Sequence, residues 1–317
     1  MTTLLVSQTN GDTHKTPKGH AERPERLEAI ANVLAQPRFG RLAREDAPAG
    51  DLALAELVHA PSVLDVIRKM RPAEGIGQID PDTFVSGKSL DAVGTALGGG
   101  LRALEAVVMG EADNAFVAAR PPGHHAERDR SMGFCLINTI AILARQAQRL
   151  HGAERVAIVD FDVHHGNGTQ DIFKDDKSVF YASSHQWPLY PGTGRPEETG
   201  VGNVVNCPLP EGSDGQAMRE VYRERIFPAL DAFRPDIILV SAGFDAERRD
   251  PLAQLEWVAD DYAWLTGKLL DIADRRCSNR LVSMLEGGYD LAGLASGVAA
   301  HVGVLLTGEA GTEHEED

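Results

Sequence analysis

The sequence contains only three cysteines, Cys135, Cys207 and Cys277, and they are widely spaced. An odd number this small argues against a disulfide framework and against a thiolate zinc site, so a reducing cytoplasm is the simplest setting. No apolar run approaches the length that crosses a bilayer. The first residues, Met1 to Val6, lack the cationic region and the small-residue cleavage site of a secretory signal. The sequence therefore predicts a cytoplasmic protein that does not cross a membrane.

Positive charge is also scarce. The chain has 31 Lys and Arg against 47 Asp and Glu, which gives a formal net charge of −16. This balance argues against binding to the phosphate backbone of nucleic acids. It would attract cationic substrates, although a soluble acidic protein is the simpler interpretation.

The chain is long enough, at 317 residues, to bury a sizeable core. No internal repeat and no linker rich in Pro, Ser and Gly divides it. We therefore predict a single domain over residues 1–307, followed by an acidic C-terminal tail over residues 308–317.

Short apolar strands alternate with helical patterns along the sequence. Predicted strands lie at residues 3–6, 115–119, 155–160, 178–183, 237–241 and 281–285. Predicted helices lie at residues 24–34, 89–109, 138–150, 214–233 and 260–275. Ser89 has the character of the N-cap of the second helix. The predicted fold class is α/β, an open parallel sheet with helices on both faces.

Unusual polar residues follow the predicted strands at the point where each strand ends. Asp160, Asp162 and His164 come at the end of one strand, and residues two apart in a strand share a face. In open α/β sheets, ligands bind at the carboxyl ends of the strands. Four further segments have the same placement: 120–125, 183–185, 243–245 and 286–290. Packing alone does not account for five such strand ends.

Asp162, His164 and Asp245 would give two carboxylates and one imidazole. Three protein ligands leave one position open, which is typical of catalytic zinc. The same oxygen and nitrogen set also suits Fe(II), Co(II) or Mn(II). The alternative is that both aspartates cap helices and that His164 is a core histidine. The convergence of three such residues favours the metal.

Three further features would suit catalysis beside a metal. His124 and His125 follow a rigid Pro-Pro-Gly turn and would suit acid–base chemistry. The alternative is that both are solvated imidazoles on a surface loop. Tyr289, in a Gly-Gly-Tyr turn, would donate to an oxyanion or simply pack a loop. Phe134 and Tyr190 would wall a narrow apolar channel or, again, pack loops.

Together these segments resemble the histone deacetylase and acetylpolyamine amidohydrolase superfamily, in particular the class II-like bacterial amidohydrolases, which share an arginase-like fold. The resemblance runs from about His14 to Tyr289. It rests on Gly-His-Ala-Glu-Arg-Pro-Glu-Arg-Leu (19–27), Arg-Pro-Pro-Gly-His-His (120–125), Gly-Phe-Cys (133–135), Asp-Phe-Asp-Val-His-His-Gly-Asn-Gly-Thr-Gln (160–170), Tyr-Pro-Gly-Thr-Gly (190–194), Ala-Gly-Phe-Asp-Ala (242–246) and Glu-Gly-Gly-Tyr (286–289).

The resemblance implies a zinc-dependent deacetylase and gives roles to the matching positions. Zn²⁺ would be held by Asp162, His164 and Asp245. His125 would act as general base, and His124 would stay cationic with Asp160 behind it. Tyr289 would stabilise the oxyanion. The substrate-binding residues that the resemblance implies are Asp82, which orients the substrate backbone, and the channel residues Gly133, Phe134, Tyr190 and Leu252.

The resemblance also implies a monovalent cation, K⁺, beside the zinc. Its ligands would be backbone carbonyls of Asp160, Asp162 and His164, together with Ser183.

The chain departs from the family pattern at several positions. Asn167 stands where class I members have an aspartate behind the second histidine, so His125 should be less basic than in that class. His20-Ala-Glu22 replaces the usual His-Pro-Glu, a minor loop change, and Tyr190 replaces a commoner phenylalanine. Leu252 falls where polyamine-selective relatives have an acidic gatekeeper, which favours acyl-lysine or another neutral acyl amide.

Three functions remain to be weighed. The first is a zinc-dependent deacylase acting on acetyl-lysine proteins, with acetylpolyamines or small amides as alternative substrates of the same site. The second is a two-metal ureohydrolase, which would need carboxylates two residues after His164 and Asp245, but Gly166 and Glu247 stand there. The third is an acyl-lysine reader, which would have no need of Tyr289 and both histidines. Loops 72–88 and 186–200 would also suit a homo-oligomer.

Overall fold

Eight strands form one parallel sheet in the computed structural model, which describes residues 1–309. The strand order is β2-β1-β5-β10-β9-β6-β7-β8, and every neighbouring pair is parallel. The strands are β1 (Thr3–Ser7), β2 (Ala43–Asp46), β5 (Asn114–Ala118), β6 (Val156–Asp160), β7 (Val179–Gln186), β8 (Val204–Leu209), β9 (Ile237–Ala242) and β10 (Leu281–Leu285). A separate antiparallel hairpin consists of β3 (Ile76–Gln78) and β4 (Phe84–Ser86).

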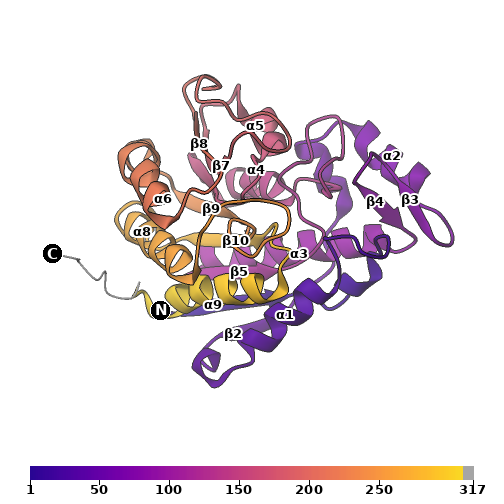
Figure 1. Ribbon diagram of the computed structural model, residues 1–317, viewed down its shortest axis with the longest axis horizontal. Helices are drawn as coiled ribbons and strands as arrows, with labels where there is room; N and C mark the ends of the chain where they lie inside the picture. Colours follow the sequence, from indigo (N-terminus) through magenta and orange to yellow (C-terminus); the bar gives the residue numbers. More distant parts are fainter. Residues whose placement is uncertain (310–317) are drawn as a thin grey trace.

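Helices cover both faces of the sheet (Figure 1). Helices α3 and α4 pack against one face, and α1, α8 and α9 form the layer on the other. The helices are α1 (Glu25–Leu34), α2 (Pro61–Met70), α3 (Ser89–Val108), α4 (Thr139–His151), α5 (Asn167–Phe173), α6 (Gly215–Val221), α7 (Phe227–Phe233), α8 (Ala259–Cys277) and α9 (Leu291–Thr307). The predicted fold class is confirmed: one domain with a parallel sheet between two helical layers.

The core is divided into two parts because side chains alternate along each strand. In β6, Val156 and Ile158 pack with α3 and α4, whereas Ala157 and Val159 pack with α8 and α9. All four side chains are fully buried. A parallel sheet covered on both faces needs apolar residues at every position, which explains the unbroken apolar runs in the sequence.

The structure corrects several details of the predicted elements. Edge strands β2 and β8 and the β3–β4 hairpin were not predicted. Ser89 is the first residue of α3 and not its N-cap, which is Lys88. The single helix predicted over 214–233 is divided by a π-helical turn at Tyr222–Ile226. Most of the predicted acidic tail, residues 310–317, lies outside the described residues.

Within residues 1–309, no helix combines the length and the apolar character that crossing a bilayer requires.

Candidate active site

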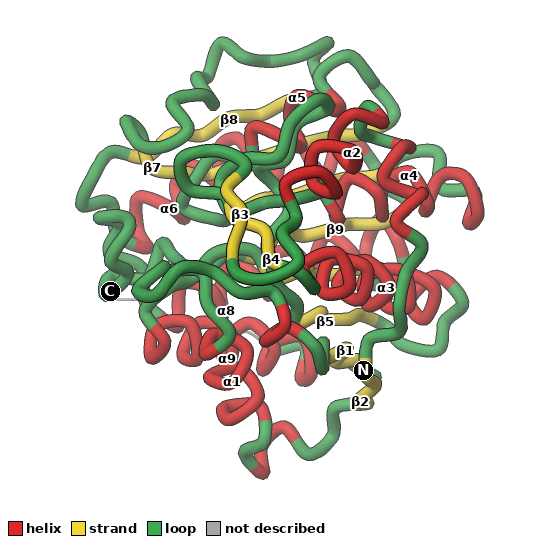
Figure 2. Tube along the Cα trace, turned by 90° about the vertical axis from the view of Figure 1, so that its right-hand side faces the viewer, coloured by secondary structure: helices red, strands yellow, loops and turns green. Residues whose placement is uncertain are grey.

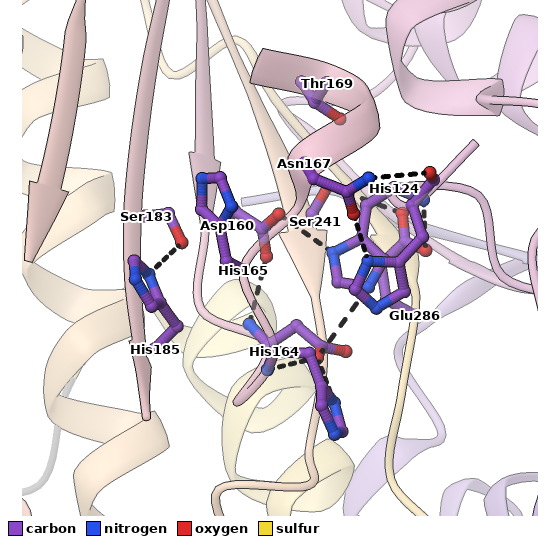
Figure 3. A network of polar contacts seen from close by, with 12 residues as sticks. His124, Asp160, His164, His165, Asn167, Thr169, Ser183, His185, Ser241 and Glu286 are labelled. Carbon is purple, nitrogen blue, oxygen red and sulfur yellow. Dashed lines mark hydrogen bonds and ion pairs between the residues drawn. The ribbon is translucent and has the colours of Figure 1, made fainter. Parts of the chain in front are cut away.

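The loops that follow β6, β9 and β10 meet at one edge of the sheet because these strands are neighbours. The loop after β6 contributes Asp162 and His164, the loop after β9 contributes Asp245, and the loop after β10 contributes Tyr289. The turn after β5 brings His124 and His125 to the same edge. The close-up in Figure 3 shows His124, Asp160 and His164 grouped at this place. Four of the five polar segments predicted to follow strand ends therefore form one site, whereas residues 183–185 lie within β7 because that strand extends to Gln186.

Asp162, His164 and Asp245 are the one group of side chains in the described part of the chain that could hold a metal ion. Their ligand atoms all lie within 4.8 Å of one another, and all three residues are buried. His164 Nδ1 lies 3.2 Å from Asp162 Oδ1 and 3.1 Å from Asp245 Oδ2. Backbone N–H groups of Gly287 and Val163 donate to Asp162 Oδ2 and Asp245 Oδ1, at 2.8 and 2.9 Å. These bonds orient the carboxylates toward a shared point.

The glycines around this group leave space that fits an ion. A Cβ atom on Gly287 would lie 2.6 Å from Asp162 Oδ2 and would collide with the carboxylate of Asp245. Gly243 is confined in the same way by Asp162. Burial raises the pKa of the Asp245 carboxyl, and the neighbouring Asp162 adds to this effect. Two buried carboxylates and one imidazole are a donor set that binds divalent transition metals. These residues therefore fit zinc.

Carboxylates face the first histidine of the pair. His124 Nδ1 lies 3.0 Å from Asp160 Oδ2, and His124 Nε2 lies 3.8 Å from Asp162 Oδ1. Burial disfavours the charged imidazole, but the charges of Asp162, Asp160 and Glu286 outweigh it and raise the pKa of His124 well above its ordinary value. These surroundings therefore favour the cationic form of His124.

An amide, by contrast, faces the second histidine. His125 Nδ1 lies 2.7 Å from Asn167 Oδ1, and Asn167 Nδ2 donates to Glu127 Oε1 at 2.6 Å. A carboxylate only accepts, so Glu127 fixes the orientation of the amide and presents its oxygen to His125. His125 consequently carries its proton on Nδ1 and leaves Nε2 as an acceptor. Burial, followed by the charges of His124 and His164, lowers the pKa of His125 well below its ordinary value.

A cavity of about 220 Å³ leads to these groups. It is lined by Asp82, His125, Gly133, Phe134, His164, Leu189, Tyr190, Leu252 and Tyr289. All five substrate-binding residues predicted from the sequence are in this lining. The cavity is thus lined by aromatic and apolar side chains together with Asp82, His125 and His164.

Unusual backbone geometry sets one wall of the channel. Gly133 and Phe134 both have positive φ, 58° and 66°. A Cβ on Gly133 would lie 2.5 Å from the imidazole of His125, so only glycine fits there. Positive φ is rare for an aromatic residue. Phe134 N donates to Thr83 Oγ1 at 3.1 Å, which helps to hold the strained residue in place.

The candidate K⁺ ligands lie on neighbouring strands. Asp160 is paired in register with Ser183 across β6 and β7. The Ser183 hydroxyl lies 2.9 Å from His185 Nδ1, as Figure 3 shows. Asp162 and His164 follow Asp160 directly in the chain. The predicted residues are thus brought together, and their role as cation ligands stays a prediction.

The sequence did not single out three residues that hold the site together. Glu286 Oε2 accepts from the backbone N–H groups of Gly123, at 2.6 Å, and His124, at 3.1 Å. Asp250 Oδ2 accepts from the backbone N–H of Tyr289 at 2.7 Å. The Arg26 guanidinium lies over the Tyr289 ring, 4.9 Å from its centre. Glu286 and Arg26 lie within motifs that we quoted, whereas Asp250 had no signal in the sequence.

The fold belongs to a known class. The parallel sheet flanked by helices matches the deacetylase and arginase-like fold, and residues 20–305 match the histone deacetylase domain. The chain belongs to the histone deacetylase family, whose members include deacetylases and amidohydrolases.

Individual relatives agree with this assignment. The chain is 38% identical over 279 residues to the histone deacetylase-like amidohydrolase of Pseudomonas aeruginosa, which covers 86% of this chain and 73% of that protein. It is 45% identical over 220 residues to the chloroplastic histone deacetylase 14 of Arabidopsis thaliana, covering 67% of this chain and 52% of that longer protein. The crystal structure of the HDA15 HD domain superposes with a TM-score of 0.91 at 34% identity, covering 97% of this chain and 89% of that one.

Proposed function

We propose that residues 1–307 form the catalytic domain of a zinc-dependent hydrolase that cleaves the amide of N-acetylated amines, with acetyl-lysine as the preferred class of substrate. The observation that carries this proposal is that His164, which is grouped with Asp162 and Asp245, lines one cavity together with His125 and Tyr289. Family membership supports the deacetylase class of reaction.

Asp162, His164 and Asp245 would hold the zinc ion. When bound, zinc would supply Lewis-acid chemistry, polarising the amide carbonyl and acidifying the attacking water.

His125 would take the proton from the attacking water and then give it to the leaving amine. Its Nε2 is the acceptor because Nδ1 is committed to Asn167 Oδ1 at 2.7 Å. A lowered pKa keeps this imidazole neutral and ready to accept at neutral pH. The cationic His124, fixed by Asp160, would stabilise negative charge that develops nearby.

Tyr289 would donate its phenolic O–H to the developing oxyanion. Burial raises the pKa of Tyr289 well above its ordinary value, so the hydroxyl keeps its proton. Arg26 and Phe134 contact the ring, at 4.9 and 5.7 Å between centres, and hold it at the channel wall. A preorganised donor of this kind acts without reorganisation during the reaction.

The channel favours a neutral acyl chain over a polyamine. Phe134 and Tyr190 form the walls, and Leu252 supplies an apolar side chain where an acidic residue would bind a second ammonium group. Asp82, at the same cavity, would orient the backbone of a peptide. Acetylpolyamines remain the alternative substrate because the chain is strongly acidic.

The experiment that tests this proposal is the release of acetate by the zinc-loaded protein from an acetyl-lysine peptide and from acetylspermidine, measured side by side. We expect a higher kcat/KM for the peptide. A preference for acetylspermidine would overturn the role of Leu252, and no acetate from either substrate would overturn the proposed reaction. The K⁺ site, the cytoplasmic location and a homo-oligomer stay predictions.

A further inference from the structure

A second cavity, of about 410 Å³, lies outside the channel. We call it the flanking pocket, and it is lined by Val63, Val66, Ile79, Asp80, Pro81, Asp129, Arg130, Ser131 and Met132. Its walls come from α2, from the turn between β3 and β4, and from the loop that follows the two catalytic histidines. Figure 2 shows α2 and the β3–β4 hairpin side by side on one side of the molecule. None of the reaction roles proposed above uses this pocket.

The flanking pocket and the channel share two wall segments. The segment 80–82 lines both cavities, with Asp80 and Pro81 in the flanking pocket and Asp82 in the channel. The segment 130–134 does the same, since Met132 faces the flanking pocket and Gly133 the channel. A substrate seated in the channel would therefore have its next residues at the edge of the flanking pocket.

Hydrogen bonds hold the walls of the flanking pocket in place. Ile79 N donates to Thr83 O at 2.8 Å and closes the turn, while Asp80 Oδ1 accepts from Thr83 N at 2.6 Å. The start of α2 is tied to the opposite loop by Ala60 N, which donates to Arg128 O at 2.7 Å. A preformed pocket binds more tightly than one that must be ordered on binding.

The lining suits an apolar side chain with a positive charge beside it. Five of the nine lining residues are apolar, and Val66 leaves 44% of its surface exposed. Asp80 and Asp129 place two carboxylates at the same pocket. Arg130 Nε already donates to Glu127 Oε2 at 2.7 Å, so its charge is largely matched. The pocket is thus apolar with a negative rim.

One wall of the pocket also contacts the catalytic residues. Asn167 Nδ2, whose amide oxygen faces His125, lies 3.3 Å from Met132 Sδ. A substrate side chain packed on Met132 would therefore act, through Met132, on Asn167, the residue that sets the tautomer of His125. Binding in the flanking pocket and positioning of the base share one contact.

We propose that the flanking pocket binds the apolar side chain of a residue close to the acyl-lysine in a polypeptide substrate, and that basic residues next to it are favoured. This inference rests on the proposed function and deepens it. A polyamine has no apolar branch to place in the pocket, so the pocket selects polypeptides over acetylpolyamines.

The test uses the zinc-loaded full chain and a series of acetyl-lysine peptides that differ in one residue. A leucine or an aspartate is placed in turn at each of the three positions before and after the acetyl-lysine. For one position we expect kcat/KM to be about tenfold higher with leucine than with aspartate, mainly through KM, because that is the scale on which an apolar pocket discriminates. A ratio near one at every position would overturn the proposal.

Two substitutions at the half-exposed Val66 then locate the effect. In Val66→Asp the leucine-to-aspartate ratio should fall to about one, and in Val66→Lys the aspartate peptide should become the better substrate. The matched control is Met109→Asp, at a position 67% exposed after the end of α3, where the ratio should not change. Retention of the wild-type ratio in both Val66 variants would contradict the flanking pocket. Absence of acetate release from every peptide would instead overturn the proposed function, and the substrate pocket with it.

Discussion

Two clusters of buried charged residues lie next to each other in this protein. They differ in how far neighbouring protein groups neutralise their carboxylates. In the N-terminal cluster, Glu22 binds Arg120 through two hydrogen bonds of 2.7 and 2.6 Å, and Arg26 lies 3.4 Å away. Although burial opposes it, the charge and hydrogen bonds of Arg120 lower the pKa of Glu22 to about 2. The remaining donors of Arg26 reach the backbone carbonyls of Gly288, at 2.6 Å, and Glu286. Protein atoms alone satisfy this carboxylate.

The strand-end cluster consists of Asp160, Asp162, Asp245 and Glu286, with the histidines between them. Burial raises the pKa of Asp160 and of Asp245, and it raises that of Glu286 to about 7. Only the carboxyl of Asp162 has a lowered pKa, because the charge of His124 outweighs burial there. At three of the four carboxyl groups, burial thus outweighs the stabilising contacts that protein groups make. The comparison supports the proposal that the N-terminal cluster is a scaffold, whereas the strand-end cluster would receive a cation.

The largest effect should come from removing a carboxylate of the strand-end cluster. Asp162→Ala deletes a ligand and the acceptor for the backbone N–H groups of His164 and Gly287. We expect loss of zinc binding and of measurable acetate release. The zinc content of the dialysed variant, measured beside Asp175→Ala at an exposed site, checks this. One equivalent of zinc retained by Asp162→Ala would overturn the ligand set.

The next change breaks the N-terminal cluster. Glu22→Gln keeps the shape of the side chain but leaves Arg120 and Arg26 buried without their carboxylate. Breaking a buried ion pair from one side costs about 3–5 kcal/mol. Denaturant unfolding should show this loss, whereas Glu25→Gln, at an exposed position of α1, should cost less than about 0.5 kcal/mol. Equal stability of the two variants would mean that the cluster is not a scaffold.

A third substitution tests the oxyanion donor, which lies where the two clusters meet. Tyr289→Phe removes the hydroxyl and keeps the ring that Arg26 and Phe134 contact. We expect kcat to fall about 10²–10³-fold. The matched variant is Tyr190→Phe, which removes the other hydroxyl of the channel and should have a much smaller effect. Full activity in Tyr289→Phe would show that the assignment is wrong.

The smallest expected effect is on stability, and it comes from a buried histidine whose pKa is shifted by burial and not by neighbouring charges. His301 lies between Thr266 Oγ1, at 2.6 Å, and Ser283 Oγ, at 2.9 Å, and burial lowers its pKa to about 3. Below pH 6.5 the unfolded chain binds a proton here and the folded chain does not. The free energy of unfolding should therefore decrease as the pH falls from 6.5 toward 3, by at most about 1.4 kcal/mol per pH unit from this residue.

This dependence can be isolated by comparing wild type with His301→Gln in denaturant melts between pH 6.5 and 4.5. The variant lacks the titrating group, so its stability should change less steeply with pH. Identical slopes would show that His301 is protonated in the folded protein as readily as in the unfolded chain.

The sequence predicted the centre of the fold better than its edges, for a physical reason. The strands buried on both faces, such as β6 and β9, are unbroken apolar runs that can be recognised by themselves. Edge strand β2 reads Ala-Arg-Glu-Asp and is largely exposed, so its sequence resembles a loop. Its register with β1 is accompanied by contacts that are distant in the chain, such as the two hydrogen bonds from Arg102 to Glu45.

The candidate site shows the same division. Asp162, His164 and Asp245 could be predicted because they follow recognisable strands, and the structure brings them together. Asp250 could not, because its role is to accept from Tyr289 N, 39 residues later in the chain. Glu286 binds backbone groups 162 and 163 residues away. Contacts of this kind leave no pattern in a local stretch of sequence.

The measurement that tests the central claim most directly is a zinc titration of the metal-free protein, with bound zinc and acetate release from an acetyl-lysine peptide followed together. We predict that activity rises in proportion to bound zinc and reaches its maximum at one equivalent, because the described residues offer one ligand group. Full activity without zinc, or a requirement for two equivalents, would contradict the account.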